Sequence, residues 1–259
     1  MEHGKPEKFT IAVPDAVLAD LRERLARTRF PGEVVNSGWS YGTNLAYLKE
    51  LVEYWRTRYD WRVHEREINQ FPQFKVEIGG IGVHYIHAEG KGPNPKPLIL
   101  LHGWPGSIYE FMRIIPMLTD PAAHGGDARD AFTVIAPSLP GYGFSDDPGG
   151  GMDPKRIADI MHSLMTEVLG YRRYGTQGGD WGALIASLMG HLYTRDVIGV
   201  HVNFVGMAPP QGARTQDLDE DEKKFLADLA AYRREEMGYF EIQGTKPQTI
   251  AYALNDSPA

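Results

Sequence analysis

An aspartate in a glycine-rich turn is the first group in this sequence that could do chemistry. Residues 178–182 read Gly-Gly-Asp-Trp-Gly, with glycines two residues before and two residues after Asp180. Such glycines let a strand turn sharply into a helix and leave the central side chain exposed. A carboxylate in that position can attack an sp³ carbon and form an ester. The alternative interpretation is that Asp180 only caps the helix that follows.

A second glycine-containing turn follows another apolar stretch. Residues 102–107 read His-Gly-Trp-Pro-Gly-Ser. Backbone N–H groups in a strand-to-helix turn of this kind can point at a developing negative charge. The alternative interpretation, which the motif alone favours, is a tight turn that needs glycine only for its backbone angles. Ligands of open α/β sheets bind at the carboxyl ends of the strands. The order of the two turns, two strands apart, therefore favours one shared site.

The elements that must position these turns alternate between strand and helix. We expect strands at 74–78, 81–87, 97–101, 132–136, 171–177 and 197–204, and helices at 107–118, 154–169 and 182–193. Two glycines at 79–80 should close the first two strands into a hairpin. The alternation predicts an α/β fold, a mostly parallel sheet with helices on both faces.

Helical segments flank this core on both sides, which predicts three segments at 1–73, 74–208 and 209–259. The first should contain a helix opened by Pro14 and Asp15 and a second one capped near Thr43, with an aromatic loop at 38–42 between them. These helices are too few to bury their own apolar faces, so we expect them to wrap onto another part. The last segment should be helical over 219–236, loop-like over 238–247 and helical again from Gln248.

The composition narrows the class of protein. A chain of 259 residues with 42% hydrophobic and 24% charged residues is typical of a soluble globular protein. The net charge of −7 argues against a nucleic-acid partner, which would need clustered basic residues. There is no cysteine to bind a metal or form a disulfide, and no His-Glu-x-x-His motif. The longest aliphatic run, residues 98–101, is far shorter than the ~20 residues that cross a membrane. We therefore expect no membrane span and a cytoplasmic protein.

The two turns together resemble the nucleophile elbow and the oxyanion-hole turn of the α/β-hydrolase fold. More narrowly, the whole chain resembles the microsomal-type epoxide hydrolases. The segments that carry this resemblance are 38–74, 102–107, 140–145, 178–182, 238–239, 245–247 and 254–258. The resemblance implies a hydrolase core with a wrapping N-terminal segment (1–73), an incomplete core (74–208) and the beginning of a helical cap (209–259).

The resemblance also implies a role for each matching residue. Asp180 would be the nucleophile, and Tyr239 a cap tyrosine that donates a proton to the epoxide oxygen. The backbone N–H groups of Trp104 and Trp181 would form the oxyanion hole. The partners implied are a small-molecule epoxide and water, with no cofactor and no metal, and the family resemblance permits a homodimer.

Water activation requires a histidine and an acid to orient it. Only His191 and His201 follow Asp180, one deep in a helix and the other within a strand, and no acid occurs from 197 to 216. The resemblance places the acid, the histidine, a second cap tyrosine and the last two core strands beyond Ala259. We therefore expect these residues to be part of a longer protein; a partner polypeptide or a degenerate protein are the alternatives.

Two other functions remain open on the sequence alone. A haloalkane dehalogenase uses the same aspartate attack, and halide release instead of diol formation would separate it from an epoxide hydrolase. A non-catalytic or partner-dependent binding module would keep the pocket without turning over. An esterase or a serine peptidase is disfavoured, because it would need serine at position 180.

Overall fold

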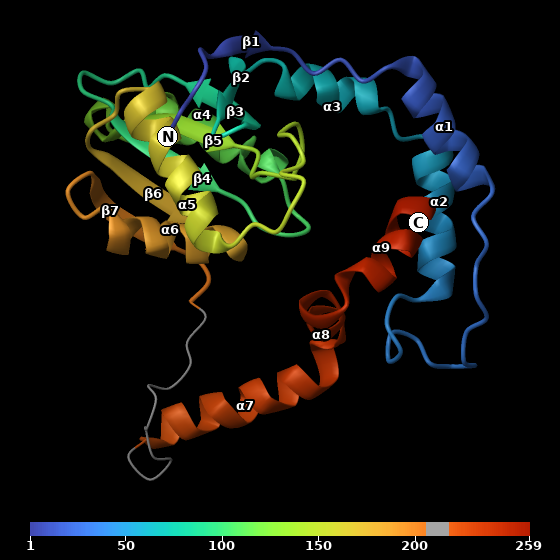
Figure 1. The fold of residues 1–259 in the computed structure, drawn as a ribbon. Helices are drawn as coiled ribbons and strands as arrows, with labels where there is room; N and C mark the ends of the chain where they lie inside the picture. The colour runs from blue at the N-terminus through green and yellow to red at the C-terminus, as the bar shows by residue number, and fades with distance from the viewer. Residues whose placement is uncertain (206–217) are drawn as a thin grey trace. The chain divides into compact units, whose positions relative to one another are not determined.

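The computed structural model describes residues 1–205 and 218–259 (Figure 1). They form two compact units. The α/β unit consists of residues 1–12 and 62–205, and the helical unit consists of residues 13–61 and 218–259. Residues 62–73 thus pack with the sheet, although the sequence groups them with the N-terminal helices. The three-segment division remains a prediction about the chain's organisation.

A seven-stranded sheet forms the centre of the α/β unit, in the order β1-β2-β3-β5-β4-β6-β7 (Figure 1). Its strands are β1 (Glu7–Phe9), β2 (Gln73–Ile78), β3 (Ile81–Ala88), β4 (Lys96–Leu101), β5 (Phe132–Pro137), β6 (Tyr174–Gly178) and β7 (Val197–Val202). The pairs β4–β5, β4–β6 and β6–β7 are parallel, whereas β1–β2, β2–β3 and β3–β5 are antiparallel. The sheet of the described residues is therefore mixed rather than mostly parallel, because β1 adds to the expected hairpin and β3 joins it to β5 in antiparallel order.

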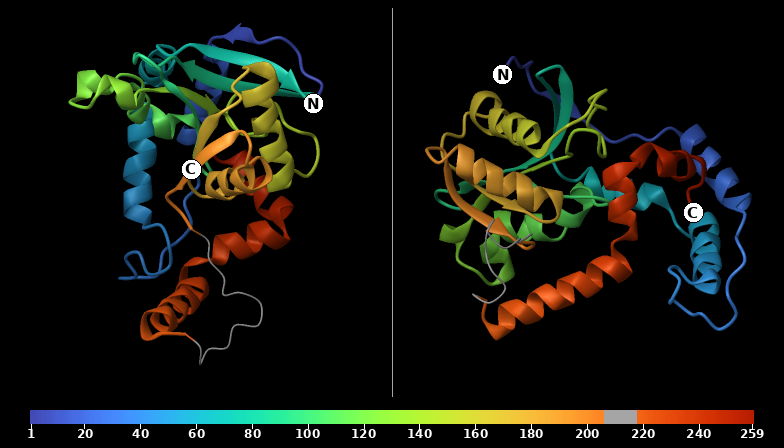
Figure 2. Two further views of the ribbon diagram at one scale, coloured as in Figure 1. Left: turned by 90° about the vertical axis from the view of Figure 1, so that its left-hand side faces the viewer. Right: turned by 60° about the horizontal axis from the view of Figure 1, so that its bottom comes forward.

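Helices cover both faces of this sheet. The described helices of this unit are α3 (Trp61–Ile68), α4 (Ile114–Thr119), α5 (Pro154–Ser163) and α6 (Trp181–Leu192), with shorter turns η1 (Ile108–Phe111), η2 (Pro121–His124), η3 (Ala128–Asp130) and η4 (Leu164–Val168). α5 and α6 lie side by side (Figure 2) and bury their apolar residues in one cluster with alternate residues of the strands. η1 and α4 contact β5. This arrangement confirms the expected sheet with helices on both faces.

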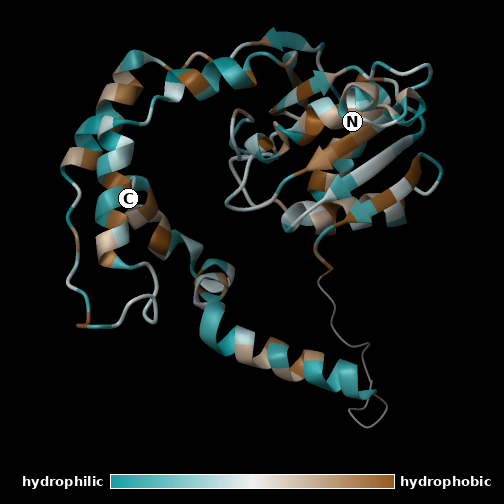
Figure 3. Cartoon of the chain, turned by 180° about the vertical axis from the view of Figure 1, so that it is seen from behind, coloured by the Kyte–Doolittle hydropathy of each residue, from teal (hydrophilic) through white to brown (hydrophobic). Residues whose placement is uncertain are grey.

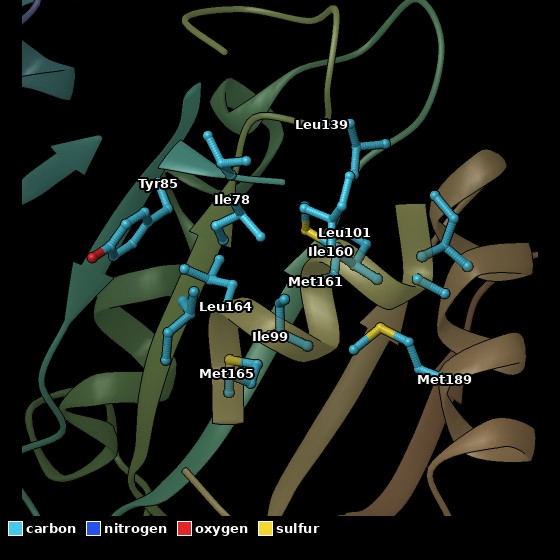
Figure 4. Packing of buried hydrophobic residues seen from close by; sticks show 14 of the residues in the cluster. Ile78, Tyr85, Ile99, Leu101, Leu139, Ile160, Met161, Leu164, Met165 and Met189 are labelled. Carbon is cyan, nitrogen blue, oxygen red and sulfur yellow. The ribbon is translucent and has the colours of Figure 1, made fainter. Parts of the chain in front are cut away.

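The core explains why the central strands read as apolar runs. Ile99 and Leu101 of β4 are fully buried in the cluster to which α5 and α6 contribute (Figure 4). Leu100 between them is 2% exposed and, because side chains alternate along a strand, faces the other side of the sheet. A strand that is covered on both faces must be hydrophobic at every position. The central strands accordingly stand out as hydrophobic in Figure 3.

Two expected helices of the α/β unit are wrong in extent. The helix expected at 107–118 is divided into η1 and α4, because Pro116 cannot donate a backbone hydrogen bond and its ring would clash with the carbonyl of residue 112 in a continuous helix. The helix expected at 154–169 remains an α-helix to Ser163 and continues as the π-helical turn η4. Strand β6 begins at Tyr174, after a turn at Gly170 with φ of 76°, rather than at residue 171.

The helical unit contains α1 (Asp15–Ala26), α2 (Leu45–Thr57), α7 (Glu220–Glu236), α8 (Gly238–Thr245) and α9 (Pro247–Asp256). Asn44, not Thr43, caps α2, and Asp219 and Glu222 form a capping box at α7. The loop expected at 238–247 is wrong, since residues 238–245 are helical. Its glycines lie near the helix ends, and Pro247 occupies the first turn of α9, where proline is tolerated. None of the described helices is long and apolar enough to span a membrane.

Candidate active site

The elbow at Asp180 is a strained backbone turn between β6 and α6. Asp180 has φ of 50° and ψ of −125°, a left-handed conformation that a non-glycine residue adopts at a cost of about 1–3 kcal/mol. Its side chain makes no capping hydrogen bond to the helix, so the capping interpretation is wrong. Such strain persists only where the surroundings enforce it. The turn therefore serves to present the Asp180 carboxylate.

Close backbone contacts enforce this turn. A Cβ atom on Gly178 would lie 2.0 Å from the carbonyl oxygen of Gly182, and a Cβ atom on Gly182 would lie 2.0 Å from the carbonyl oxygen of Leu101. Any side chain at either position would move the backbone. Both glycines of the motif are therefore required by lack of space, and β4 packs directly against the first turn of α6.

The turn after β4 receives the Asp180 carboxylate. The Trp104 N–H donates a hydrogen bond of 2.8 Å to Asp180 Oδ1. A Cβ atom on Gly103 would lie 2.2 Å from the same oxygen, so glycine is needed there for the carboxylate to reach the amide. The structure thus brings together Asp180 and the Trp104 amide, two of the groups that the sequence singles out.

The Trp181 amide lies at the helix end beside the nucleophile candidate. Trp181 is the first residue of α6, and the helix itself supplies no acceptor for an N–H at that position. Both indole rings are partly exposed, Trp104 to 39% and Trp181 to 45%. The role of the Trp181 N–H in an oxyanion hole remains a prediction.

His102 braces the turn from behind, a role that the sequence reading missed. It is 1% exposed, its Nε2 accepts the Leu139 N–H at 3.1 Å, and its Nδ1 lies 3.1 Å from the Gly103 carbonyl oxygen. Because a backbone amide can only donate, Nε2 is the acceptor and Nδ1 carries the proton that Gly103 O accepts. Burial lowers the pKa of His102 and keeps the ring neutral. The available signal was its position directly after a buried strand.

The loop after β5 packs against His102. The Tyr142 ring packs edge-on against His102 with ring centroids 5.2 Å apart. Burial raises the pKa of the Tyr142 phenol, and the charge of Asp180 raises it further. Tyr142 belongs to segment 140–145, so that segment supports the turn beneath Asp180.

A pocket of about 450 Å³ opens above Asp180, within the size range of small-molecule sites. Its described lining consists of Gly103, Trp104, Pro105, Gly106, Glu110, Gly179, Asp180, Asn203 and Phe204. Glu110 and Asn203 are polar groups that the sequence reading did not select. The signal for Glu110 was the Ser-x-x-Glu spacing from Ser107, which is typical of a helix N-terminus. Asn203 offered no comparable pattern.

The remaining histidines do not contribute to this lining. His191 is exposed in the last turn of α6, and His201 is exposed in β7, opposite Gln177. His84 is fully buried, with its ring between Ser138 Oγ at 2.9 Å and Gln73 Oε1 at 3.0 Å, and burial lowers its pKa to about 4. In residues 1–205 and 218–259 no group of three or more His, Asp or Glu residues could hold a metal ion.

Tyr239 lies in the helical unit, on α8, and its side chain is 45% exposed. The sequence reading expects it in a loop, whereas it occupies the first turn of a helix. Its role as a proton donor remains a prediction.

Comparisons with known proteins agree with this fold. Residues 6–111 match the family model described as "Epoxide hydrolase N terminus", and residues 96–247 match that of the alpha/beta hydrolase fold. A protein of Stigmatella aurantiaca that is provisionally named an epoxide hydrolase is 48% identical over 97% of this chain and 57% of its own length. Epoxide hydrolase 1 of Oryctolagus cuniculus is 38% identical over 100% of this chain and 61% of its own length.

A solved structure shows the same likeness. The epoxide hydrolase of Aspergillus niger superimposes with a TM-score of 0.85 at 31% sequence identity, over 98% of this chain and 66% of that one. The chain belongs to the α/β-hydrolase fold family and, within it, to the epoxide hydrolase family. It spans 57% and 61% of the lengths of the two curated relatives.

Proposed function

We propose that the protein to which these residues belong hydrolyses small-molecule epoxides to vicinal diols through an ester on Asp180. The observation that carries the proposal is the strained elbow, which presents a carboxylate with one oxygen already bound by the Trp104 amide. Carboxylate attack suits an sp³ carbon, because the product is an ester that water can cleave. The names of the relatives support the same substrate class.

In the first step, Asp180 Oδ2 attacks an epoxide carbon while the C–O bond of the ring breaks. The resulting alkoxide takes a proton from the Tyr239 phenol, because a phenol is a much stronger acid than the alcohol that the alkoxide becomes. Oδ1 becomes the carbonyl oxygen of the ester. It is the oxygen that the Trp104 N–H contacts at 2.8 Å, so this amide is positioned before the reaction begins.

In the second step, water attacks the ester carbon and negative charge develops on Oδ1. The amides of Trp104 and Trp181 would stabilise it, and one such donor typically contributes ~3 kcal/mol to the transition state. Water must also lose a proton to a base. The described lining of the pocket contains no histidine. We propose that the histidine and its acid lie outside these 259 residues, so that this chain alone forms the ester but hydrolyses it slowly.

Intact-mass measurement of the 259-residue chain after exposure to styrene oxide tests this proposal. We expect a persistent gain of one epoxide mass, absent from Asp180→Asn and present in a matched Asp130→Asn variant, since Asp130 is an exposed carboxylate away from the pocket. When the ester is hydrolysed in ¹⁸O-labelled water, the oxygen of that water should appear in the Asp180 carboxylate. An unmodified wild-type chain, or an adduct that Asp180→Asn retains, would show the proposal to be wrong.

The same assay addresses the dehalogenase alternative. A chain that is alkylated by 1-bromobutane with release of bromide, but not by the epoxide, would favour a dehalogenase.

A cytoplasmic location, which rests on the composition of the sequence, and a homodimer, which the family resemblance permits, are further proposals. Light scattering of the purified chain measures the oligomeric state directly.

A further inference from the structure

The turn at 103–107 holds two carboxyl groups, one at each end. Trp104 N–H binds Asp180 Oδ1 near its start, and the Ser107 N–H binds the Glu110 carboxylate near its end. Each carboxyl lies against a glycine: a Cβ atom on Gly103 would be 2.2 Å from Asp180 Oδ1, and one on Gly106 would be 1.6 Å from Glu110 Oε1. Glycine at 103 leaves room for the Asp180 side chain, and glycine at 106 leaves room for the Glu110 carboxyl in the conformation that it adopts here.

Glu110 has a structural role that explains part of this arrangement. Ser107 Oγ accepts the Tyr109 N–H at 3.2 Å, and the Glu110 carboxylate reaches back to the Ser107 N–H, as in a capping box. A capping residue is usually directed to solvent. Here the residue is exposed to solvent and also lines the pocket that contains Asp180. Its geometry therefore places a second negative charge beside the reacting group.

Partial burial raises the pKa of Glu110, and the charge of Asp180 raises it further, whereas the Ser107 N–H lowers it. Alkylation of Asp180 converts a carboxylate into a neutral ester and removes that repulsion. Repulsion in the free enzyme that disappears during the reaction lowers the barrier. By linkage, ionisation of Glu110 favours the ester, and formation of the ester favours ionisation of Glu110.

We propose that Glu110 is a positioning residue of the proposed epoxide hydrolase: it fixes the turn that carries the Trp104 amide, and its negative charge makes Asp180 the more reactive nucleophile. This inference rests on the proposed function. No proton passes directly between the two carboxyls; Glu110 exchanges its proton with solvent, and the alkoxide takes its proton from Tyr239 as described above.

Other titratable groups of the pocket region leave this coupling intact. Burial lowers the pKa of His102 below its ordinary value, and burial and the charge of Asp180 raise the pKa of Tyr142, so neither group is charged at pH 8. Tyr109 of η1, next to Glu110 in sequence, has its phenol oxygen 2.9 Å from His64 Nδ1, and that nitrogen also lies 3.0 Å from Glu67 Oε2. His64 is therefore engaged by these two groups.

The test compares alkylation rates of the 259-residue chain by intact mass between pH 4.5 and 8.5. Glu110→Gln keeps the side-chain length and an oxygen for the Ser107 N–H but removes the charge. At pH 8 we expect it to be alkylated about three- to tenfold more slowly than the wild type, with the gap narrowing below the pKa of Glu110. Glu77→Gln removes an exposed carboxylate of β2 and should retain the wild-type profile.

A second measurement does not depend on alkylation. Carboxyl ¹³C NMR, with the Glu110 signal assigned from Glu110→Gln, should show a lower pKa for Glu110 in Asp180→Asn than in the wild type. If Glu110→Gln follows the wild-type pH profile, or if Asp180→Asn leaves the Glu110 titration unchanged, the coupling is wrong although the proposed function stands. If the wild type is not alkylated at all, the proposed function fails as well.

Discussion

The two turns that meet at Asp180 are held in place by different forces. At the elbow after β6, backbone atoms of Gly178, Gly182 and Leu101 approach so closely that no side chain fits between them. In the turn after β4, by contrast, His102, Ser107 and Glu110 hold the backbone through hydrogen bonds. Asp180, the proposed nucleophile, is therefore positioned by steric exclusion, and the Trp104 amide, its proposed oxyanion donor, by polar side chains.

This difference predicts how each turn responds to change. The steric clash in the elbow cannot be relieved in part, because even an added methyl group must displace a backbone atom. Hydrogen bonds can be removed one at a time and depend on protonation. We expect glycine substitutions in the elbow to destabilise the fold strongly and to prevent the reaction, and substitutions of the polar side chains in the other turn to reduce stability and reaction stepwise.

Gly182→Ala should have the largest effect. Its Cβ atom would lie 2.0 Å from the Leu101 carbonyl oxygen, so β4 and α6 must separate. We expect a loss of about 4–5 kcal/mol in unfolding free energy and no alkylation of Asp180. Urea unfolding followed by tryptophan fluorescence measures the first quantity, and intact mass the second. Gly199→Ala, with nothing within 4 Å of its Cβ position, is the control; similar losses in both variants would contradict steric exclusion.

His102→Leu should have an intermediate effect. The substitution leaves the buried Gly103 carbonyl and the Leu139 N–H without their partner on His102, at a cost of about 3 kcal/mol. Alkylation should slow but persist, because Asp180 and the elbow are unchanged. Loss of alkylation as complete as in Gly182→Ala would show that the two turns are not independent.

The same variant has a pH signature. Burial lowers the pKa of His102 below the ordinary value of 6.5, so the unfolded chain binds its proton first as the pH falls. This contribution to stability is complete above pH 6.5 and is lost as the pH decreases from there. His84, with a pKa of about 4, adds a parallel loss between pH 6.5 and 4. The unfolding free energy of His102→Leu should therefore fall less steeply with decreasing pH than that of the wild type. If the two proteins lose stability equally with decreasing pH, His102 does not support the turn as a neutral side chain.

The sequence predicts the elbow better than the turn opposite, for the same physical reason. Gly178, Asp180 and Gly182 have a fixed spacing because neighbouring backbone imposes it, and that spacing is visible in one dimension. The partners of the other turn come from separate elements: Leu139 follows β5, and Asp180 follows β6. A pairing across 37 or 76 residues leaves no local pattern, which is why the role of His102 could not be read from the sequence.

Strand positions were predicted closely, whereas helix limits and sheet direction were not. Apolar runs such as 97–101 define buried strands with little ambiguity. The helix expected at 107–118 takes no account of Pro116, and the loop expected at 238–247 follows the average preference of glycine, whereas the effect of either residue depends on where in a helix it lies. The antiparallel half of the sheet depends on β1 and on the β3–β5 pair, neither of which has a sequence signal of its own.

Ser107→Ala should have the smallest effect of the three substitutions. It removes the acceptor of the Tyr109 N–H at the start of η1 but leaves the Ser107 backbone N–H that binds Glu110. Losing one capping side chain typically costs about 1 kcal/mol, so we expect a loss of that size in urea unfolding and an alkylation rate within about twofold of the wild type. If the rate instead falls as far as in His102→Leu, the end of the turn at Ser107 positions the Trp104 amide as strongly as the buried histidine does. The graded response expected of a hydrogen-bonded turn would then be absent.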